Sequence, residues 1–429
     1  MSEFDKIIGY KSIKKELERF CDVLKNYDRY SALGVKLPSG MLIHGEAGLG
    51  KTLMANCFIK ESGWKCFVCK KDKPDGYFVE EIKRIYDEAK RNQPAIVFLD
   101  DFDKFSNSTS GRFNTEEFVT VQTCIDNAKG EKIFTFATAN NINCFSDSLL
   151  RVGRFDKIIK VDVPNLKDAK AIIEYYLSQK ISVDEIDIDE VAKIMGSSSC
   201  AVLETVINEA GIYAGANNKD KIDMDDIVSA CMRVMFKAPE TLSEEKQKYL
   251  DRLAYHEAGH TVIAEILEPT SVNLVSVLKY EGDIGGITSL TTDEGYWQNE
   301  KFMENRIIVL LGGLAALDCV FGESDIGANS DITRAHRILE RFFEEYCIRG
   351  FEFFASEFPS NKNVKTKDKK EALMTAELNR YYKIAKKILI ENREFLDKIA
   401  NALMEKKTIR FKEIAEIKKN SILVGCDRR

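Results

Sequence analysis

Residues 40–164 alternate short apolar runs with longer amphipathic stretches, and this alternation predicts an α/β domain built on a parallel sheet. The apolar runs are MLIHG, WKCFV, AIVFLD, IFTFATA and IIKVDV. Residues 166–236 lose this strand character and continue as helical patterns such as LKDAKAIIEYYLSQ, which predicts a helical lid after a first domain of residues 1–165. A polar, proline-containing stretch at 237–248 predicts a linker, and residues 249–429 predict a third, mainly α-helical domain.

Length and charge narrow the possible functions. A chain of 429 residues with 44% hydrophobic content is long enough for two or three separate cores. Its net charge of −6 gives no general attraction to phosphate backbones or anionic lipid, so we do not expect nucleic acid as a partner.

Neither secretion nor membrane insertion is expected. The amino-terminal residues carry charges every few positions, unlike a signal peptide. The longest apolar stretch, at 307–317, is well short of the roughly 20 residues that span a bilayer. The 11 cysteines lie mostly in apolar runs, which is typical of thiols in a reducing cytoplasm. Cys66 and Cys69 form the CxxC of WKCFVCK, which has no second pair to complete a zinc site and indicates strand packing.

A glycine-rich loop, GEAGLGKT, follows the first apolar run and precedes the helical LMANCFIKE. Strand, loop and helix in this order are typical of a P-loop, and this context disfavours a glycine turn with a chance lysine. Backbone N–H groups from Gly48 onward would cradle phosphates, Lys51 would reach the β and γ phosphates, and Thr52 would bind Mg²⁺. We expect ATP to be bound by Gly45, Glu46, Ala47, Gly48, Leu49, Gly50, Lys51 and Thr52.

A second nucleotide signal is AIVFLDD, an apolar run that ends in two carboxylates. Acidic residues at strand ends are common, but in the same sheet as a P-loop they indicate a Mg²⁺ site. Asp100 would hold the metal and Asp101 would orient the attacking water.

Two further segments resemble those of a known family of ATPases. ATAN at 137–140 and SLLRVGRFDK at 148–157 resemble the sensor strand and the arginine-finger segment of AAA+ ATPases. The resemblance implies that Asn140 contacts the γ-phosphate or the water, and that Arg151 and Arg154 point into a neighbouring subunit's site, where they would stabilise developing charge. Either arginine alone could instead form a solvated ion pair on a loop.

The sequence differs from the usual AAA+ pattern at two places. Asp101 stands where the family usually has glutamate, so its shorter carboxylate predicts slower ATP turnover. The aromatic pore loop is displaced, with Gly76, Tyr77 and Phe78 as its substitute or, equally, as core residues that open a helix.

The third domain carries HEAGH, which contains two of only four histidines in the chain. Spacing i, i+4 places His256 and His260 on one helix face, with Glu257 able to reach a metal-bound water. Two surface histidines with an incidental glutamate are disfavoured by the apolar continuation TVIAEIL. This combination predicts a Zn²⁺ peptidase in which Glu257 transfers protons.

Local spacing does not identify the third zinc ligand. Residues 312–339 are similar to the FtsH peptidase, and an aspartate in the matching SDI position completes that family's site, which implies Asp331. Asp325 and His336 are the alternatives, and His336 is expected to be structural.

The resemblance to the FtsH family extends over nearly the whole chain and implies an AAA+ ATPase domain with a helical lid, followed by a zinc metallopeptidase domain. It further implies a homo-hexamer that acts on polypeptide substrates. We expect a cytoplasmic member without the family's amino-terminal transmembrane pair. Because we expect that pair to be missing and Leu314 stands where arginine is common in the family, the resemblance does not imply membrane-protein substrates.

Three functions compete at this level. The leading hypothesis is ATP-dependent proteolysis, in which a ring pulls polypeptides to a zinc site. The second is an unfoldase whose metallopeptidase-like domain serves only assembly, and Asp101 keeps this possibility open. The third, an ATP-independent peptidase, would leave the P-loop unexplained.

Overall fold

The computed structural model describes residues 2–71, 78–105, 116–182, 185–239, 241–242, 244–278, 286–291, 299–323, 329–353 and 364–425. The chain packs as two compact units. The first comprises Met1–Ser182 and Ser197–Asn208, and the second comprises Val183–Gly196 and Glu209–Arg429. Helix α8, Cys200–Ala216, therefore begins in the first unit and ends in the second.

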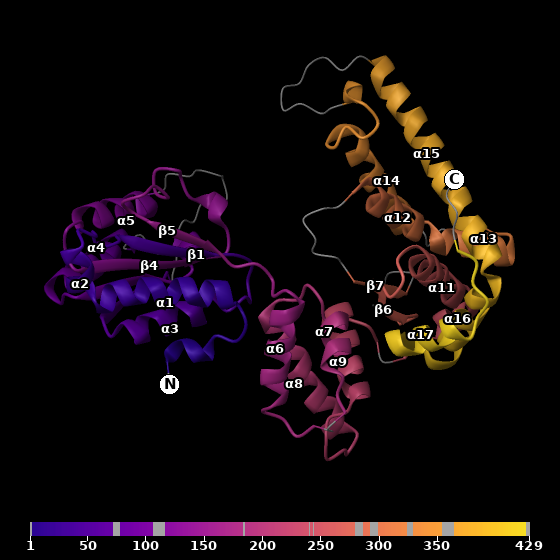
Figure 1. Ribbon diagram of the computed structural model, residues 1–429, viewed down its shortest axis with the longest axis horizontal. Coiled ribbons are helices and arrows are strands. Elements are labelled where there is room, and N and C mark those ends of the chain that lie inside the picture. The colour runs from indigo at the N-terminus through magenta and orange to yellow at the C-terminus, as the bar shows by residue number, and fades with distance from the viewer. Residues whose placement is uncertain are drawn as a thin grey trace. The chain divides into compact units, whose positions relative to one another are not determined.

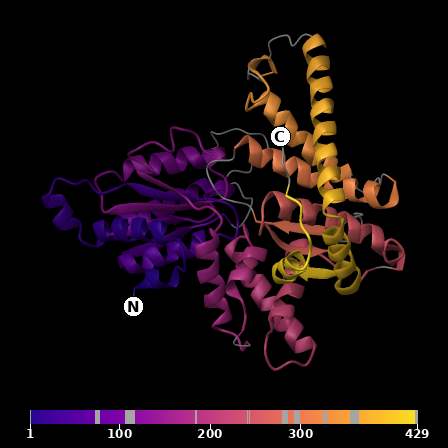
Figure 2. The same ribbon diagram turned by 45° about the vertical axis from the view of Figure 1, so that its right-hand side comes forward.

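The first unit is built on a five-stranded sheet of order β2-β3-β4-β1-β5, in which every neighbouring pair is parallel. Figure 2 shows the sheet with helices along it. The predicted parallel sheet is confirmed, and each strand overlaps the apolar run that predicted it. The strands are β1 Gly40–His44, β2 Lys65–Cys69, β3 Ala95–Leu99, β4 Ile133–Ala139 and β5 Lys157–Lys160.

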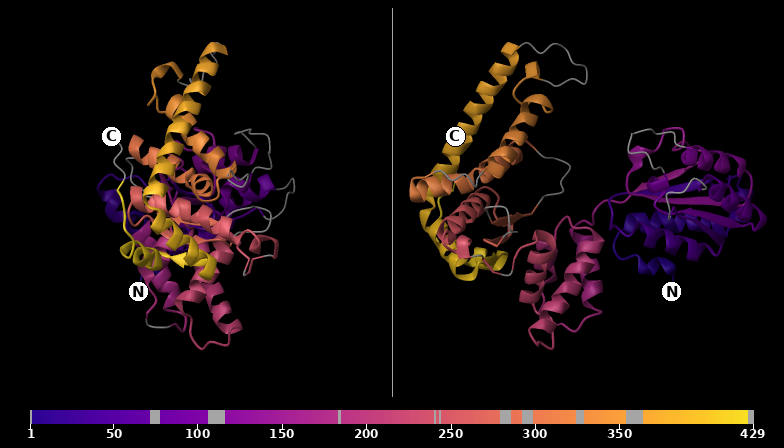
Figure 3. Two further views of the ribbon diagram at one scale, coloured as in Figure 1. Left: turned by 90° about the vertical axis from the view of Figure 1, so that its right-hand side faces the viewer. Right: turned by 180° about the vertical axis from the view of Figure 1, so that it is seen from behind.

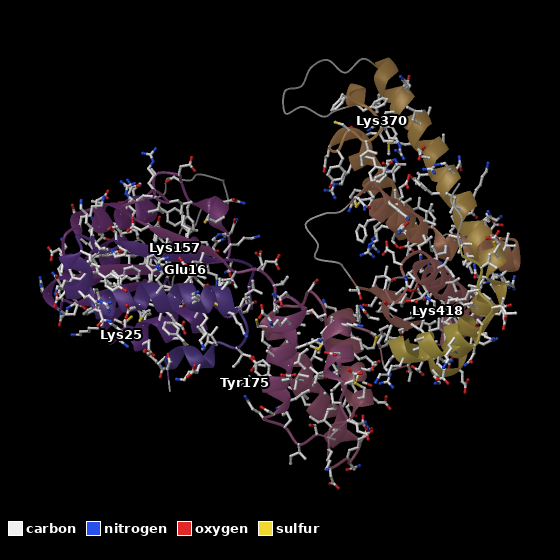
Figure 4. All side chains as sticks on the ribbon, in the orientation of Figure 1. Glu16, Lys25, Lys157, Tyr175, Lys370 and Lys418 are labelled. Atoms are coloured by element: carbon white, nitrogen blue, oxygen red, sulfur yellow. The ribbon has the colours of Figure 1, made fainter. Side chains whose placement is uncertain are left out.

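Helices cover both faces of this sheet, which explains why β3 and β4 are apolar without alternation and buried along their whole length. Helix α4 is amphipathic and buries Ile82, Ile85 and Tyr86. An ion pair of 2.5 Å between Lys157 on β5 and Glu16 on α1 ties the edge strand to a helix (Figure 4). The elements of this unit are η1 Glu3–Lys6, α1 Lys11–Lys25, α2 Tyr27–Ala32, α3 Lys51–Ser62, α4 Phe78–Arg91, η2 Phe102–Phe105, α5 Glu116–Asn127, η3 Ile142–Cys144 and α6 Leu166–Leu177.

The structure bears on two predictions for this unit, the role of the CxxC cysteines and the candidate pore loop. Cys66 and Cys69 both lie on β2 as free thiols, in agreement with a packing role. Phe78 is buried at the start of α4, with its ring 4.8 Å from that of Phe105, so it is a core residue. Gly76 and Tyr77, the other two candidates for a pore loop, lie outside the described residues.

The second unit is mostly helical and centres on α11, which is buried on nearly every side between α12, α13 and α16. Helix α15 is the longest and runs beside α14 (Figures 1 and 3). The helices are α7 Ile188–Ile194, α9 Met224–Phe236, α10 Glu244–Gln247, α11 Leu250–Leu267, α12 Glu300–Leu310, α13 Gly312–Phe321, α14 Asn329–Glu344, η5 Phe351–Phe353, α15 Val364–Glu391, α16 Arg393–Lys406 and α17 Phe411–Lys419.

A three-stranded antiparallel sheet of order β7-β6-β8 lies among these helices, and no strand of it was identified in the sequence, which predicted a mainly helical domain. Its strands are β6 Val272–Ser276, β7 Ile287–Leu290 and β8 Thr408–Arg410. Strands of three to five residues carry little period-2 signal, and β8 joins β6 from a distant part of the chain. Tertiary packing, which a local pattern cannot report, therefore creates this sheet.

Helix α7 joins the second unit through ion pairs to the segment that follows β8. The ammonium of Lys412 lies 2.8 Å from Asp187, and Lys193 lies over the ring of Phe411. Lys418 on α17 reaches the buried Glu265 on α11 at 2.7 Å (Figure 4). Among the described residues, the helices are each too short or too polar to cross a membrane.

Candidate functional site

The predicted nucleotide residues meet at the carboxyl ends of three adjacent strands. The P-loop follows β1, Asp100 follows β3 and Asn140 follows β4, and β4 lies between the other two strands. The carboxyl ends of parallel strands share one edge of a sheet, and the amino terminus of α3 begins there at Lys51. Strand order thus gathers side chains that are far apart in sequence.

Lys51 is 7% exposed and its ammonium donates to three oxygens. They are the carbonyls of Gly45 and Glu46, at 2.8 and 2.6 Å, and Asn140 Oδ1 at 2.8 Å. Burial lowers the pKa of Lys51, whereas the charges of Asp101, Asp103 and Asp100 act against that shift. The P-loop lysine and the predicted sensor residue are therefore already in contact.

Thr52 and Asp100, the two residues predicted to hold Mg²⁺, are in direct contact. The hydroxyl of Thr52 donates to Asp100 Oδ1 at 3.1 Å, and that of Thr138 donates to the same oxygen at 2.9 Å. A hydroxyl and a carboxylate oxygen in contact are ligands that Mg²⁺ accepts. Asp101 has a positive φ of 52°, and its Oδ2 lies 2.7 Å from the ammonium of Lys104.

The start of α8 is a third part of this candidate site, and no motif in the sequence predicted it. The backbone N–H of Ala201 donates to the carbonyl of Gly48 at 2.9 Å, which joins the P-loop to a helix that was assigned to the lid. The serines of GSSSC before α8 are typical of a helix start, but no spacing connects them to the P-loop.

The two predicted finger arginines differ in their surroundings. Arg154 is held by Asp126, with an Nη2–Oδ2 distance of 2.7 Å, and also donates to the carbonyl of Ser148. Arg151 is exposed and forms no ion pair within the part of the chain that the structure describes. Only Arg151 is therefore free to reach another molecule without breaking an internal contact.

The metal-site candidates converge in the second unit. Helix α11 presents His256 and His260, and α14 presents Asp331 in its first turn. The two Nε2 atoms lie 3.1 Å apart, and Asp331 Oδ2 lies 3.4 Å from each. Ligand atoms placed about 2.1 Å from a shared tetrahedral centre lie about 3.4 Å from one another, so the three atoms fit Zn²⁺.

Surrounding groups orient these ligands. His260 Nδ1 lies 2.6 Å from the carbonyl of Val309, to which it donates, and this leaves its Nε2 lone pair directed at the centre. Gly313 lies against the ring of His256, where a Cβ would come within 2.4 Å of Cε1. A side chain at 313 would therefore displace the first ligand.

Hydrogen bonds and charges among the three candidate ligands shift the pKa values of Asp331 and His260. Although burial acts against it, hydrogen bonds with His256 and His260 hold the pKa of Asp331 well below its usual range. Burial alone would lower the pKa of His260, but the hydrogen bond to Asp331 and the nearby carboxylate charge raise it above its ordinary value of 6.5.

The raised pKa predicts that zinc affinity falls in mild acid. A zinc ion held by His260 would have to displace a proton from it, so below the raised pKa of His260 the apparent Kd for zinc should weaken about tenfold per pH unit for each proton displaced. Competition with a chelating dye between pH 5 and pH 8 measures this. A Kd that stays constant over the whole range would contradict the proton competition.

Of the two alternative third ligands, the structure describes only His336, which does not join this cluster. His336 is exposed on α14, five residues beyond Asp331. Asp325 lies outside the described residues. Glu257 is buried on α11, and its carboxylate accepts from the N–H of Gly286 and the hydroxyl of Thr288, two partners that the sequence analysis missed.

Two family models match the segments of the chain that contain the two candidate sites. Residues 41–163 match the ATPase family associated with various cellular activities (AAA), and residues 240–417 match peptidase family M41. The ATP-dependent zinc metalloprotease FtsH of Caldicellulosiruptor bescii is 31% identical, over 96% of this chain and 71% of that protein. FtsH 2 of Thermoanaerobacter sp. is 28% identical, over 96% of this chain and 82% of that protein.

A plant relative, the chloroplastic FTSH 1 of Arabidopsis thaliana, is 29% identical over 95% of this chain and 61% of its own length. These matches run through the P-loop unit and the HEAGH unit together. The chain therefore belongs to the FtsH family of ATP-dependent zinc metalloproteases.

Proposed function

We propose that His256, His260 and Asp331 are the zinc ligands and that Glu257 is the general base and acid of peptide hydrolysis. The observation that carries this proposal is the convergence of two Nε2 atoms and one carboxylate oxygen at 3.1 to 3.4 Å. Bound zinc supplies a water whose pKa is lowered to roughly 7. Glu257 takes a proton from the attacking water and delivers it to the leaving nitrogen.

The proposed ATPase roles follow the contacts at the sheet edge. Lys51 turns from the carbonyls of Gly45 and Glu46 to the phosphates, and Thr52 with Asp100 holds Mg²⁺. Asn140 orients the γ-phosphate or the water, and Asp101 positions that water. The nucleotide-binding domain would comprise residues 1–165, the lid 166–236 and the metallopeptidase domain 249–429, an arrangement supported by family matches at 41–163 and 240–417.

We further propose a homo-hexamer in which Arg151 acts in trans. This role is supported by its exposure, whereas Arg154 is bound to Asp126 and would hold the finger segment in place. Arg154 could reach a neighbour only after that pair opens. Polypeptides would be the substrates, and a net charge of −6 gives no support for nucleic acid.

Removal of the Arg151 side chain should lower the rate of ATP hydrolysis and leave the affinity for nucleotide unchanged. An arginine finger contributes roughly 10³-fold or more to phosphoryl transfer, so Arg151→Ala should lower ATPase kcat by about that factor. Mixing Arg151→Ala with Lys51→Ala chains should restore part of the activity, because an intact P-loop then faces an intact finger. Steady-state ATPase assays on verified mixed rings measure this.

The matched control puts both changes in one chain. Mixing the double variant Lys51→Ala/Arg151→Ala with Lys51→Ala should restore nothing, since no intact P-loop is present. Equal activity in the two mixtures, or full activity of Arg151→Ala alone, would rule out the trans role.

Cytoplasmic location is the proposed cellular context. It is supported by the ten cysteines within the described residues, all of which are free thiols, a state typical of a reducing compartment.

The whole proposal is tested by degradation of casein with ATP, with ADP and with a chelator. ATP-dependent proteolysis requires degradation in the first condition only. Degradation with ADP would indicate a peptidase independent of the motor, and ATPase activity without degradation would indicate the unfoldase alternative. The intact ligand set gives that alternative no support.

A further inference from the structure

The side chain of Glu257, which lies beside the proposed metal ligands, is held in place by hydrogen bonds. It is 3% exposed, and both carboxylate oxygens accept hydrogen bonds from the same short segment. The N–H of Gly286 donates to Oε1 at 2.9 Å, and the hydroxyl of Thr288 donates to Oε2 at 2.8 Å. Two fixed donors therefore define the position of the carboxylate.

Pairing within the small sheet holds the segment that supplies these donors. On β7, Ile287 pairs with Ser276 and Thr288 pairs with Val275 of β6. Gly286 precedes β7 at a close approach, because a Cβ there would lie 2.3 Å from the carbonyl of Ser276 and 2.5 Å from Glu257 Cγ. The edge strand thus lies directly against the side chain of Glu257.

We propose that Thr288 is a positioning residue for peptide hydrolysis, which holds the carboxylate of Glu257 in the orientation that receives the proton from water. This inference rests on the proposed role of Glu257. Each carboxylate oxygen has two acceptor sites, so one hydrogen bond to each leaves a site free on each oxygen. A long, rotatable glutamate is thereby pre-organised before substrate arrives.

A purely structural role makes a different prediction. Buried polar groups need hydrogen-bond partners, so Thr288 could serve only to satisfy a buried carboxylate. Its loss would then lower stability and leave turnover per folded, zinc-loaded chain unchanged. Positioning of the proton acceptor instead predicts a loss in kcat, with KM unchanged because Thr288 acts through Glu257.

The chain offers a matched set of variants. Thr288→Val removes the hydroxyl at similar shape, and Thr288→Ser retains it. Thr291→Val removes a hydroxyl from the residue after β7 that donates to Asn273 Oδ1 at 2.8 Å, away from Glu257. It controls for the loss of one hydroxyl hydrogen bond in the same sheet.

The readouts are kcat and KM for a fluorogenic peptide with ATP present, normalised to bound zinc. A hydrogen bond to a charged group lost in Thr288→Val should lower kcat roughly ten- to a hundredfold, with KM and zinc content unchanged. Thr288→Ser should recover most of kcat, and Thr291→Val should match the parent.

Three results would overturn the inference: a wild-type kcat for Thr288→Val, a Thr288→Ser variant as slow as Thr288→Val, or an equal kcat loss in Thr291→Val. If Thr288→Val does not fold, Thr288→Ser and Thr288→Ala at the same zinc occupancy decide, with a higher kcat expected for serine. Glu257→Gln in the same assay separates the two claims. If it cleaves at the parental rate, the proposed role of Glu257 fails, whereas an inactive Glu257→Gln beside a fully active Thr288→Val rejects only the role of Thr288.

Discussion

Glu257→Gln should abolish peptide hydrolysis while zinc stays bound at about one ion per chain. General acid–base catalysis contributes roughly 10²- to 10⁴-fold, and an amide can neither take a proton from water nor return it to the leaving nitrogen, so kcat should fall by at least that range. Zinc should remain because the three converging ligand atoms belong to His256, His260 and Asp331. Peptide turnover and metal content by mass spectrometry measure the two quantities.

The contrasting variant is Asp331→Ala, which removes one of the ligand atoms 3.4 Å from both Nε2 atoms. Zinc affinity and hydrolysis should then fall together, and ATPase activity should survive because the P-loop belongs to the other unit. Full zinc and full activity in Asp331→Ala would show that another residue, with Asp325 and His336 as candidates, completes the site. Parental cleavage by Glu257→Gln would remove the basis of the proposed mechanism.

Lys51→Ala should lose ATP binding and, with it, degradation of folded substrates. The ammonium of Lys51 lies at the meeting point of the P-loop carbonyls and Asn140, where the phosphates would be held. Its removal leaves the β and γ phosphates without their buried cation, so we expect ATP affinity to fall by roughly tenfold or more. Titration with a fluorescent ATP analogue measures the affinity, and short unstructured peptides should still be cleaved.

Lys60→Ala is the control, because Lys60 lies exposed in the last turn of the same helix. It should bind nucleotide like the parent. A thermal melt of Lys51→Ala checks that the first unit still folds after three hydrogen bonds are lost. An unchanged ATP affinity in a folded Lys51→Ala chain would contradict the P-loop assignment.

Much of the fold and of the two candidate sites could be predicted because their main motifs are contiguous in the sequence. In GEAGLGKT and HEAGH the covalent chain sets the relevant spacing, so strand, loop and helix order or i, i+4 periodicity alone brings the groups together. The five parallel strands were equally readable, because sheets covered on both faces leave continuous apolar runs. In these segments, the residues that carry the chemistry are also close together in the sequence.

Local patterns in the sequence could not identify the third candidate metal ligand. From residue types alone, Asp325, Asp331 and His336 were all possible, and a family resemblance selected among them. In the structure, the packing of α14 brings Asp331 Oδ2 to 3.4 Å from both histidines and leaves His336 exposed. Distances between residues on different helices depend on how those helices pack, which no spacing rule contains.

The same reason explains the remaining differences. Arg151 and Arg154 are equivalent in the sequence, and only the contact with Asp126 on α5 distinguishes them. Gly286 and Thr288 belong to no motif, and they reach Glu257 because residues 272–276 pair with both 287–290 and the distant 408–410. The sequence alone therefore identified the two motifs around which the candidate sites are built. The partners of those motifs depended on long-range packing, since each contact joins segments whose separation along the chain carries no periodic signal.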